Sequence, residues 1–261
     1  MGIARAAGSV IEAVRRRGFQ AQAKADRSLV TEADIAADQV IARALTDMFP
    51  DDGWLSEESP VRWGDSGASW VVDPLDGTEA FVKGGTRGYA VQIARLVEGI
   101  IELGVVYEPA VDELFLARRG AGAWVSRRGG PVEPVRVTQG LAARRFVCST
   151  RTRPELRDLM LERGLVDAGA FRSVGVKVGL LASGHAEVYP LTHRVGYWDV
   201  CAPLIILEEA GGHGTYLDGQ RPAFPLDPPW EMEGPMLMSG LPLDEHLEFC
   251  QAFSTLLADQ G

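Results

Sequence analysis

The chain has 261 residues, of which 46% are hydrophobic, so it can bury a sizeable core as one large domain or two closely packed ones. This composition excludes a disordered or fibrous protein. The 36 acidic residues outnumber the 26 basic ones, and the formal net charge of −10 argues against a nucleic-acid polymer or a membrane as a partner.

The first half of the chain predicts helices followed by a sheet. One helix is expected over residues 3–17, and a second begins near Thr31, buries one face and ends at Pro50. Thr31 and Asp34 have the spacing of a capping box at its start. Short β-prone runs then predict an antiparallel sheet. These runs span residues 69–72, 89–96, 100–107, 113–117 and 123–126.

The second half of the chain alternates predicted strands and helices. The runs that alternate span residues 146–149, 154–163, 174–183, 186–189 and 200–210. A turn near Gly140 suggests a boundary between two domains, residues 1–140 and residues 141–261. The proline-rich residues 222–235 are expected to form an irregular loop.

The cysteines and the apolar segments bear on the cellular compartment. Cys148, Cys201 and Cys250 are odd in number and widely spaced, which indicates neither a disulfide framework nor a thiolate metal site. No apolar run follows a basic start, and no stretch approaches the roughly 18 apolar residues of a membrane span. We therefore expect a cytoplasmic protein.

The segment with the most candidate functional residues is Trp70-Val-Val-Asp-Pro-Leu-Asp-Gly-Thr78. Asp73 and Asp76 follow an apolar run, so both are expected in a tight turn at the end of a strand, where they cannot both point into the core. Pro74 biases Asp73 towards an extended backbone, and Gly77 permits positive φ. An ordinary surface turn is the alternative interpretation.

Other acidic residues have similar surroundings. Glu57 and Glu58 follow a short apolar run, and Asp199 opens an apolar helix that is expected to hold Pro203 in its first turn. A solvated turn and a helix N-cap are the respective alternatives. Carboxylates without a cysteine or histidine cluster favour a hard cation such as Mg²⁺. Three histidines lack ligand spacing and are expected at the surface or the edge of the core, namely His185, His193 and His213.

Taken together, these segments resemble the inositol monophosphatase superfamily, which includes inositol monophosphatases, 3′(2′),5′-bisphosphate nucleotidases and histidinol-phosphatases. The order and spacing of the segments make the resemblance specific. The matching residues are 24–34, 55–58, 73–78, 104–109, 173–175, 198–199 and 209–212. The resemblance implies an α+β fold, a layered α-β-α-β-α sandwich with an N-terminal antiparallel sheet region and a C-terminal mixed α/β region.

The resemblance also implies a site. The first domain would bind two or three Mg²⁺ ions, and the second would complete the active site. The implied metal ligands are the carboxylates of Glu57, Asp73, Asp76 and Asp199 and the backbone carbonyl of Leu75. The implied catalytic residues, which activate or orient the attacking water, are Asp34, Glu57 and Thr78. The implied substrate-binding residues are Asp76, Gly77, Thr78, Ser173, Gly175 and Asp199. Inhibition by Li⁺ and a homodimer are further implications.

The choice of substrate depends on smaller segments. Residues 24–28, 55–58 and 198–203 resemble the bisphosphate nucleotidase (CysQ-like) branch, whereas residues 173–175 and 209–212 resemble inositol monophosphatases. The latter have an acidic residue about seven positions before the metal-binding Asp of the Trp-Asp pair, where this chain has Thr192.

A neutral Thr192 beside His193 and Arg194 suits a second phosphate, although this pair can equally form a solvated turn. We therefore expect a Mg²⁺-dependent phosphomonoester hydrolase that acts on a small phosphorylated metabolite by metal-activated water. The first expectation is a 3′(2′),5′-bisphosphate nucleotidase, with inositol-1-monophosphatase or histidinol-phosphatase as the alternative. A metal-binding regulatory protein of the same fold is the non-enzymatic alternative.

Overall fold

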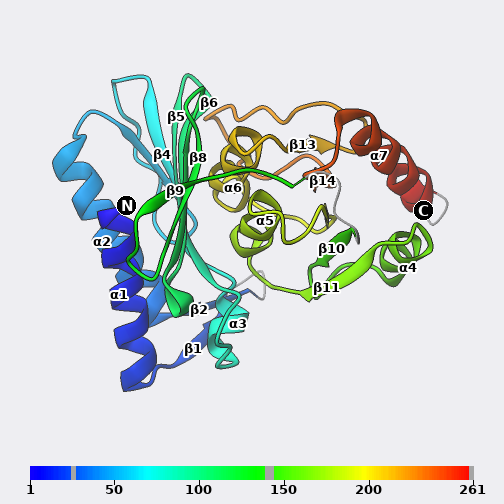
Figure 1. Cartoon of the computed structure of the whole chain (residues 1–261). Coiled ribbons are helices and arrows are strands. Elements are labelled where there is room, and N and C mark those ends of the chain that lie inside the picture. Colours follow the sequence, from blue (N-terminus) through cyan, green and yellow to red (C-terminus); the bar gives the residue numbers. More distant parts are fainter. Residues whose placement is uncertain (25–27, 139–143, 259–261) are drawn as a thin grey trace.

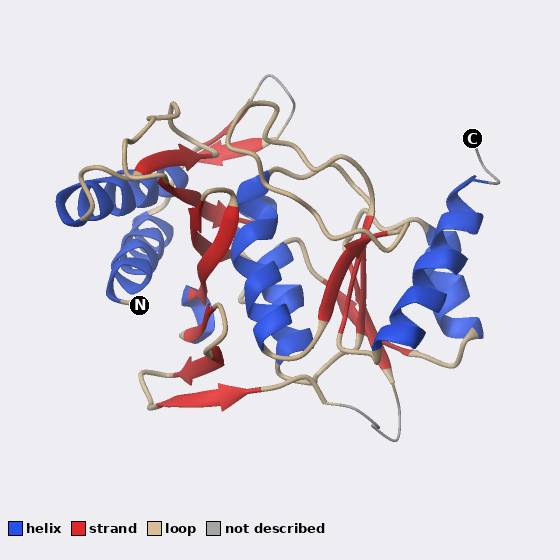
Figure 2. Ribbon diagram, turned by 90° about the horizontal axis from the view of Figure 1, so that it is seen from above, coloured by secondary structure: helices blue, strands red, loops and turns tan. Residues whose placement is uncertain are grey.

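The computed structural model describes residues 1–24, 28–138 and 144–258. Its helices and sheets form five layers (Figures 1 and 2). Two helices, α1 and α2, cover the outer face of a seven-stranded sheet, and α5 and α6 lie between this sheet and a five-stranded one, which α4 and α7 cover on the far side. The expected α+β sandwich with α-β-α-β-α layers is therefore confirmed.

The seven-stranded sheet has the strand order β3-β4-β5-β6-β7-β8-β9. Its strands are β3 (Gly53–Ser56), β4 (Ala68–Asp76), β5 (Ala90–Val97), β6 (Ile100–Glu108), β7 (Glu113–Arg118), β8 (Gly122–Arg127) and β9 (Val132–Val135). From β4 to β9 all pairings are antiparallel, as predicted, whereas the unpredicted edge strand β3 pairs parallel to β4. A 3-10 turn, η1 (Pro109–Val111), joins β6 to β7.

The two predicted N-terminal helices are α1 (Gly2–Arg17) and α2 (Glu32–Met48). The predicted capping box of α2 is present, since Asp34 Oδ2 accepts the backbone N–H of Thr31 at 2.8 Å and Thr31 Oγ1 accepts that of Ala33 at 3.1 Å. An unpredicted hairpin of β1 (Ala21–Ala23) and β2 (Leu29–Thr31) joins the two helices. This hairpin brings residues before α2 close to the end of β4 (Figure 1).

The five-stranded sheet has parallel and antiparallel pairs and the order β11-β10-β12-β14-β13. Its strands are β10 (Arg145–Cys148), β11 (Val166–Ala170), β12 (Val188–Leu191), β13 (His213–Tyr216) and β14 (Met236–Ser239). β10 is parallel to β11 and β12, and β14 is antiparallel to β12 and β13. The helices of this half are α4 (Pro154–Glu162), α5 (Val174–Ala182), α6 (Tyr197–Glu209) and α7 (Leu243–Ala258).

The two central helices are apolar around their circumference because both sheets cover them. α6 begins at Tyr197, so Pro203 lies inside the helix and not in its first turn, which corrects the expectation from sequence. The proline-rich residues 222–235 are irregular, as expected, apart from one isolated bridge between Gly196 and Glu231.

The proposed domain boundary near residue 140 falls in residues 139–143, outside the described residues. Each sheet lies on one side of it, but α5 and α6 also pack against the seven-stranded sheet, and one apolar cluster contains residues of both sheets. The division into residues 1–140 and 141–261 therefore stays a prediction. In the described part of the chain, no helix has the length and apolar character to cross a membrane.

Candidate active site

Strand β4 carries the first two carboxylates of the site. The strand runs beyond the predicted residues 69–72 as far as Asp76, and its register with β5 shifts between Asp73 and Asp76. Both residues line one cavity of about 470 Å³ and are only 1% and 5% exposed, respectively. Both carboxylates thus face the cavity and not the apolar core, because the irregularity breaks the alternation of side chains that a regular strand would impose. Their burial excludes the surface-turn alternative.

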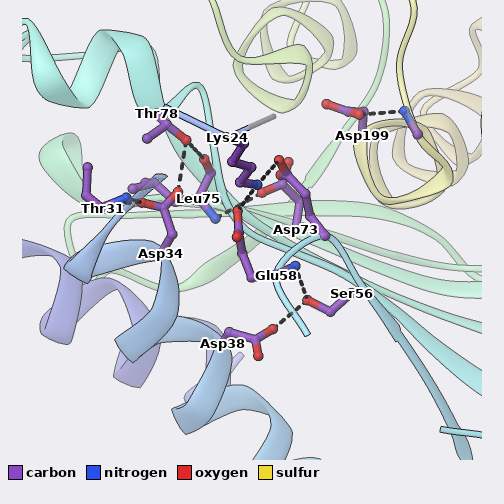
Figure 3. A network of polar contacts seen from close by, with 12 residues as sticks. Lys24, Thr31, Asp34, Asp38, Ser56, Glu58, Asp73, Leu75, Thr78 and Asp199 are labelled. Carbon is purple, nitrogen blue, oxygen red and sulfur yellow. Dashed lines mark hydrogen bonds and ion pairs between the residues drawn. The ribbon is translucent and has the colours of Figure 1, made fainter. Parts of the chain in front are cut away.

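A third carboxylate comes from α6, in the helix layer that packs on the seven-stranded sheet. Asp199 is the third residue of α6, and one carboxylate oxygen of each of Asp73, Asp76 and Asp199 lies within 4.8 Å of the others. Figure 3 shows Asp73 and Asp199 on their separate elements. Residues 126 positions apart in the sequence thus converge because α6 packs directly on the seven-stranded sheet.

Each aspartate uses one oxygen to fix its orientation. Asp73 Oδ1 accepts the N–H of Leu75 at 2.9 Å, and Asp199 Oδ2 accepts that of Gly196 at 2.8 Å. Asp199 therefore does cap its helix, but as the third helical residue, with Gly196 at the N-cap position. The second oxygen of each aspartate is left for a cation.

Asp76 is held more firmly than the other two. Its Oδ2 accepts three hydrogen bonds from donors on β5 and at the start of α5. These donors are Gln92 Nε2 at 2.6 Å, Ser173 Oγ at 2.6 Å and Gly175 N at 2.9 Å. Three donors saturate this oxygen and leave Oδ1 as the ligating atom.

The cluster carries more negative charge than its surroundings neutralise. Burial raises the pKa of Asp73 well above its usual range, and the charge of Glu57 adds to this shift. Although part of Asp199 reaches the cavity, burial of its carboxylate and the charge of Asp76 raise its pKa as well. Burial also raises the pKa of Asp76 to about 6, against the effect of its hydrogen bonds. A divalent cation would remove this repulsion, and an all-oxygen donor set suits Mg²⁺.

Asp34 and Thr78 form the second part of the site. Thr78 Oγ1 lies 2.9 Å from Asp34 Oδ1 and 3.0 Å from the carbonyl oxygen of Leu75 (Figure 3). The other oxygen of Asp34 accepts the backbone and side-chain donors of Thr31. Asp34 thus caps α2 and positions Thr78 at the same time, and burial raises its pKa.

Glu57 lines the same cavity but has a cationic neighbour. It follows β3, and Lys24 Nζ lies 2.8 Å from Glu57 Oε1 and also donates to Glu58. Burial raises the pKa of Glu58 to about 7 despite Lys24. Glu57 does not belong to the group of aspartate oxygens within 4.8 Å. Its role as a metal ligand stays a prediction.

Gly77 makes the corner between β4 and the short helix α3 (Thr78–Val82). Its φ is +88°, and a Cβ at this position would lie 2.5 Å from the carbonyl oxygen of Gly88. Only glycine fits both the backbone angle and this contact. The corner places Thr78 at the start of α3, where the first N–H groups have no partners within the helix.

Ser173 and Gly175 lie behind Asp76. Besides donating to Asp76, Ser173 caps α5 by accepting the N–H of Val176 at 3.0 Å. A Cβ on Gly175 would meet Val106 Cγ1 at 2.8 Å, so glycine allows α5 to approach β6. Neither residue lines the cavity. The structure places both where they orient a metal ligand, and their predicted contact with substrate is untested.

Most of the basic side chains of the cavity wall were not predicted from the sequence. Arg151 and Arg172 line the cavity together with Lys83 and Glu79. Arg151 and Arg172 come from separate segments, and a single arginine in a loop does not by itself indicate a binding site. The sequence offers one indication, which is that Arg172 immediately precedes the Ser173 motif. Arg194, which was expected near a second phosphate, also lines the cavity, but it pairs with Glu231 and its side chain is 86% exposed.

One of the three histidines without ligand spacing, His193, lies near the aspartates. His193 lines the cavity, and burial lowers its pKa to about 4, so the ring is neutral at physiological pH. None of the three belongs to the carboxylate cluster among the described residues.

Comparison with known proteins gives a consistent result. The model of the inositol monophosphatase family matches residues 1–246. A histidinol-phosphatase of Chlorobaculum parvum is 37% identical over 206 residues, which cover 76% of either chain. The 3′(2′),5′-bisphosphate nucleotidase CysQ of Salmonella typhimurium is 34% identical over 193 residues, covering 73% of this chain and 77% of CysQ. The structure of an IMPase of Thermotoga maritima superimposes with a TM-score of 0.80 and 26% identity, over 100% of this chain and 97% of that one.

Proposed function

The chain belongs to the inositol monophosphatase family, and from this premise we propose that it is a Mg²⁺-dependent 3′(2′),5′-bisphosphate nucleotidase. Members of this family are phosphatases, and so is this chain. The substrate is the part that we propose. One observation carries it: Arg151 and Arg172 line the same cavity as the aspartate cluster.

The metal ligands in this proposal are Asp73, Asp76, Asp199, Glu57 and the carbonyl oxygen of Leu75, which together would hold two or three ions. When bound, Mg²⁺ supplies positive charge that neutralises the phosphate and lowers the pKa of a nearby water. The hydrogen bonds that fix one oxygen of each aspartate keep the other oxygen in place for this purpose.

Thr78 and Asp34 orient the attacking water. The Thr78 hydroxyl donates its proton towards Asp34 Oδ1, so its lone pairs can accept a hydrogen bond from the water. Asp34, whose pKa is raised by burial, is placed to receive the proton through Thr78. The N–H groups of Gly77 and Thr78 at the corner before α3 would bind oxygens of the scissile phosphate.

The charge of the cavity wall favours a bisphosphate over the other candidate substrates. A polyol hydroxyl needs an acceptor, and this chain has Thr192 at the position that is acidic in inositol monophosphatases. Histidinol carries a cationic amine, which Arg151 and Arg172 would repel. A second phosphate would instead gain charge-assisted hydrogen bonds from them. Histidinol-phosphatase remains the second candidate because of the 37% identical relative.

A phosphate-release panel tests the substrate assignment. Adenosine 3′,5′-bisphosphate, inositol 1-phosphate, histidinol phosphate and fructose 1,6-bisphosphate would be compared in the presence of Mg²⁺. We expect the highest kcat/KM for adenosine 3′,5′-bisphosphate, by about tenfold or more, which corresponds to roughly 1.4 kcal/mol of transition-state discrimination. A preference for histidinol phosphate would replace the first candidate by the second, and a preference for inositol 1-phosphate would refute both.

Three further proposals accompany this function. Li⁺ would inhibit by competing for a Mg²⁺ position, and inhibition assays at fixed Mg²⁺ test this. The chain would form a homodimer, so light scattering should give about twice its mass of 28.2 kDa. It would act in the cytoplasm, a compartment in which the free, buried thiols of Cys148, Cys201 and Cys250 stay reduced.

A further inference from the structure

The substrate cavity has an acidic part and a basic part. The aspartate cluster forms the acidic part. Arg151, in the turn after β10, and Arg172, immediately before α5, contribute to the basic part together with Lys83, in the turn that ends α3. The side chain of Arg172 is 22% exposed and that of Arg151 is 58% exposed, so both guanidinium groups remain accessible from the cavity.

The carboxylate of Glu79 interacts with all three of these cations. Glu79 Oε1 accepts hydrogen bonds from Arg172 Nη2 at 2.7 Å and from Lys83 Nζ at 2.7 Å, and Glu79 Oε2 lies 4.0 Å from Arg151 Nη2. The bond from Lys83 and the charges of Arg172 and Lys83 lower the pKa of Glu79, so it is ionised at neutral pH. The basic part therefore keeps an excess of positive charge, although the chain as a whole carries −10.

The geometry allows an anionic group of the substrate to replace Glu79 as the partner of Arg172. Glu79 is the second residue of α3, two positions beyond Gly77, so it sits beside the place proposed for the scissile phosphate. Pairs that are partly open to solvent, such as Arg172 with Glu79, contribute little to stability and can be replaced at low cost. A planar guanidinium binds a phosphate or a carboxylate through two parallel hydrogen bonds, which is more than Glu79 makes with either arginine here.

We propose that Arg151 and Arg172 form a subsite for a second anionic group of the substrate, a phosphate or a carboxylate, and that this group displaces Glu79 from Arg172. This inference rests on the proposed function in one respect, since it places the scissile phosphate at the aspartates. Glu79 then acts as a specificity-determining residue. A substrate with a single phosphate leaves the Arg172–Glu79 pair intact and gains nothing from the subsite, whereas a substrate with two anionic groups replaces Glu79.

The test uses two matched pairs of substrates. Adenosine 3′,5′-bisphosphate and adenosine 3′-phosphate share the same scissile ester and differ only in the second phosphate, as do fructose 1,6-bisphosphate and fructose 1-phosphate. The measured quantity is the ratio of kcat/KM between the members of each pair. Arg151→Gln and Glu79→Gln are the test variants. Arg157→Gln is the control, because Arg157 pairs with Asp167 and does not line the cavity.

We expect the unmodified protein to prefer the bisphosphate of at least one pair. Arg151→Gln should lower that preference by about 3- to 10-fold through KM, a range that allows for the solvent exposure of Arg151. Glu79→Gln should raise it by about 3-fold, because the competing carboxylate is gone. Arg157→Gln should leave it unchanged. Arg172 is not substituted because it adjoins Ser173, which holds Asp76.

Three results would overturn the inference: no preference for either bisphosphate, an equal effect of Arg151→Gln on both members of a pair, or no rise with Glu79→Gln. Thermal unfolding of each variant separates these results from misfolding. Failure of the proposed function looks different. In that case the adenosine pair is not hydrolysed, while the fructose pair still shows opposite shifts in the two variants.

Discussion

At the scale of single residues, the site depends on the two carboxylate oxygens of each aspartate having different roles. Asp73 and Asp199 each give one oxygen to a backbone N–H, and Asp76 gives one to three donors at once. One oxygen of each of the three carboxylates lies within 4.8 Å of the others, and these bonds hold the carboxylates in that arrangement. Geometry and charge can therefore be separated by experiment.

Replacing Asp76 by asparagine removes the charge and preserves the shape. The amide oxygen can accept the hydrogen bonds from Gln92, Ser173 and Gly175, which turns the NH₂ group towards the metal position and excludes a cation. We expect kcat/KM to fall by at least about 100-fold, since the loss of outer-shell partners alone costs about 10- to 100-fold. The melting temperature without metal should hold or rise because one buried charge is gone.

The exposed Asp158, on α4 and away from the cavity, provides the control. Asp158→Asn should change neither kcat/KM nor the melting temperature. Near-normal turnover of Asp76→Asn would contradict the assignment of Asp76 as a metal ligand.

The pair of Thr78 and Asp34 is tested by a comparison of two threonines. Both Thr78 and Thr31 donate a hydroxyl hydrogen bond to Asp34, but only Thr78 lines the cavity. Thr78→Ala should lower kcat by about 100-fold, as expected when a water-orienting group is lost. Thr31→Ala should cost about 1 kcal/mol of unfolding free energy, because it removes the helix cap, and leave kcat nearly unchanged. Equal losses of kcat would mean that the role of Thr78 is structural.

The sequence predicted the acidic residues of the aspartate cluster and, of the arginines that line the cavity, only Arg194. Asp73, Asp76 and Asp199 could be predicted through the family resemblance, which rests on the order and spacing of several short motifs, because each motif alone left a turn or a helix cap as the alternative. Arg151 and Glu79 could not, because they meet only through the packing of α3 against the turn after β10. The burial of both Asp73 and Asp76 also escaped prediction, although Pro74 lies within the register shift and a proline inside a strand indicates such an irregularity.

At the scale of elements, the corner between β4 and α3 determines the position of Thr78 in the site. Gly77 makes this corner with φ of +88° and a close approach to Gly88. Gly84, at the other end of α3, provides a matched comparison, because its φ is +73° and a Cβ there would have open space around it. The two positions share the backbone strain and differ in the contact.

We expect Gly84→Ala to cost about 1–2 kcal/mol of unfolding free energy, the strain of a left-handed residue, and to leave kcat unchanged. Gly77→Ala should cost more than this and should also lower kcat/KM, because Thr78 must move with the corner. Chemical denaturation and phosphate release measure the two effects. Equal stability and full activity of both variants would show that the contact with Gly88 is not restrictive.

The elements themselves were predicted unevenly. Strands β4 to β8 and helix α2 were found because β-prone runs between turn residues and a one-sided apolar pattern mark them. Helices α5 and α6 were found as continuous apolar runs, because both sheets cover them. β3 and β9 were missed as short edge strands. Helix α7 was also missed, although its buried residues His246, Phe249, Cys250 and Phe253 have helical spacing that could have revealed it.

At the scale of the whole molecule, the site joins the two sheet layers. Asp73 and Asp76 belong to the seven-stranded sheet, and Asp199 belongs to a helix that packs between the sheets. A cation bound by all three therefore links the layers and stabilises the folded chain by mass action. The size of this effect depends on pH, because the cation competes with protons for the carboxylates.

The direction of this pH dependence follows from the raised pKa values. Burial raises the pKa of Asp76 from 3.8 to about 6, and the pKa values of Asp73 and Asp199 are raised as well. Without metal, the stability that protonated Asp76 contributes is fully present below pH 3.8 and is lost as the pH rises through about 6. The raised pKa values of Asp73 and Asp199 act in the same direction. Mg²⁺ binds only after the protons leave, so its stabilising effect should increase over the same range.

We therefore expect Mg²⁺ to raise the melting temperature by several degrees at about pH 8 and by little or nothing at about pH 5. Differential scanning calorimetry with and without Mg²⁺ measures this difference. Asp76→Asn should show no increase at either pH. A gain that is equal at both values would place Mg²⁺ binding outside the aspartate cluster.

The dependence of phosphate release on free Mg²⁺ tests the central claim most directly. The substrate would be adenosine 3′,5′-bisphosphate, and the protein would be stripped with a chelator and then titrated with Mg²⁺. We predict no measurable turnover in the stripped protein, saturable recovery with Mg²⁺, and no recovery in Asp199→Asn. Turnover that persists after chelation, or normal recovery in Asp199→Asn, would contradict a metal-dependent site built on Asp73, Asp76 and Asp199.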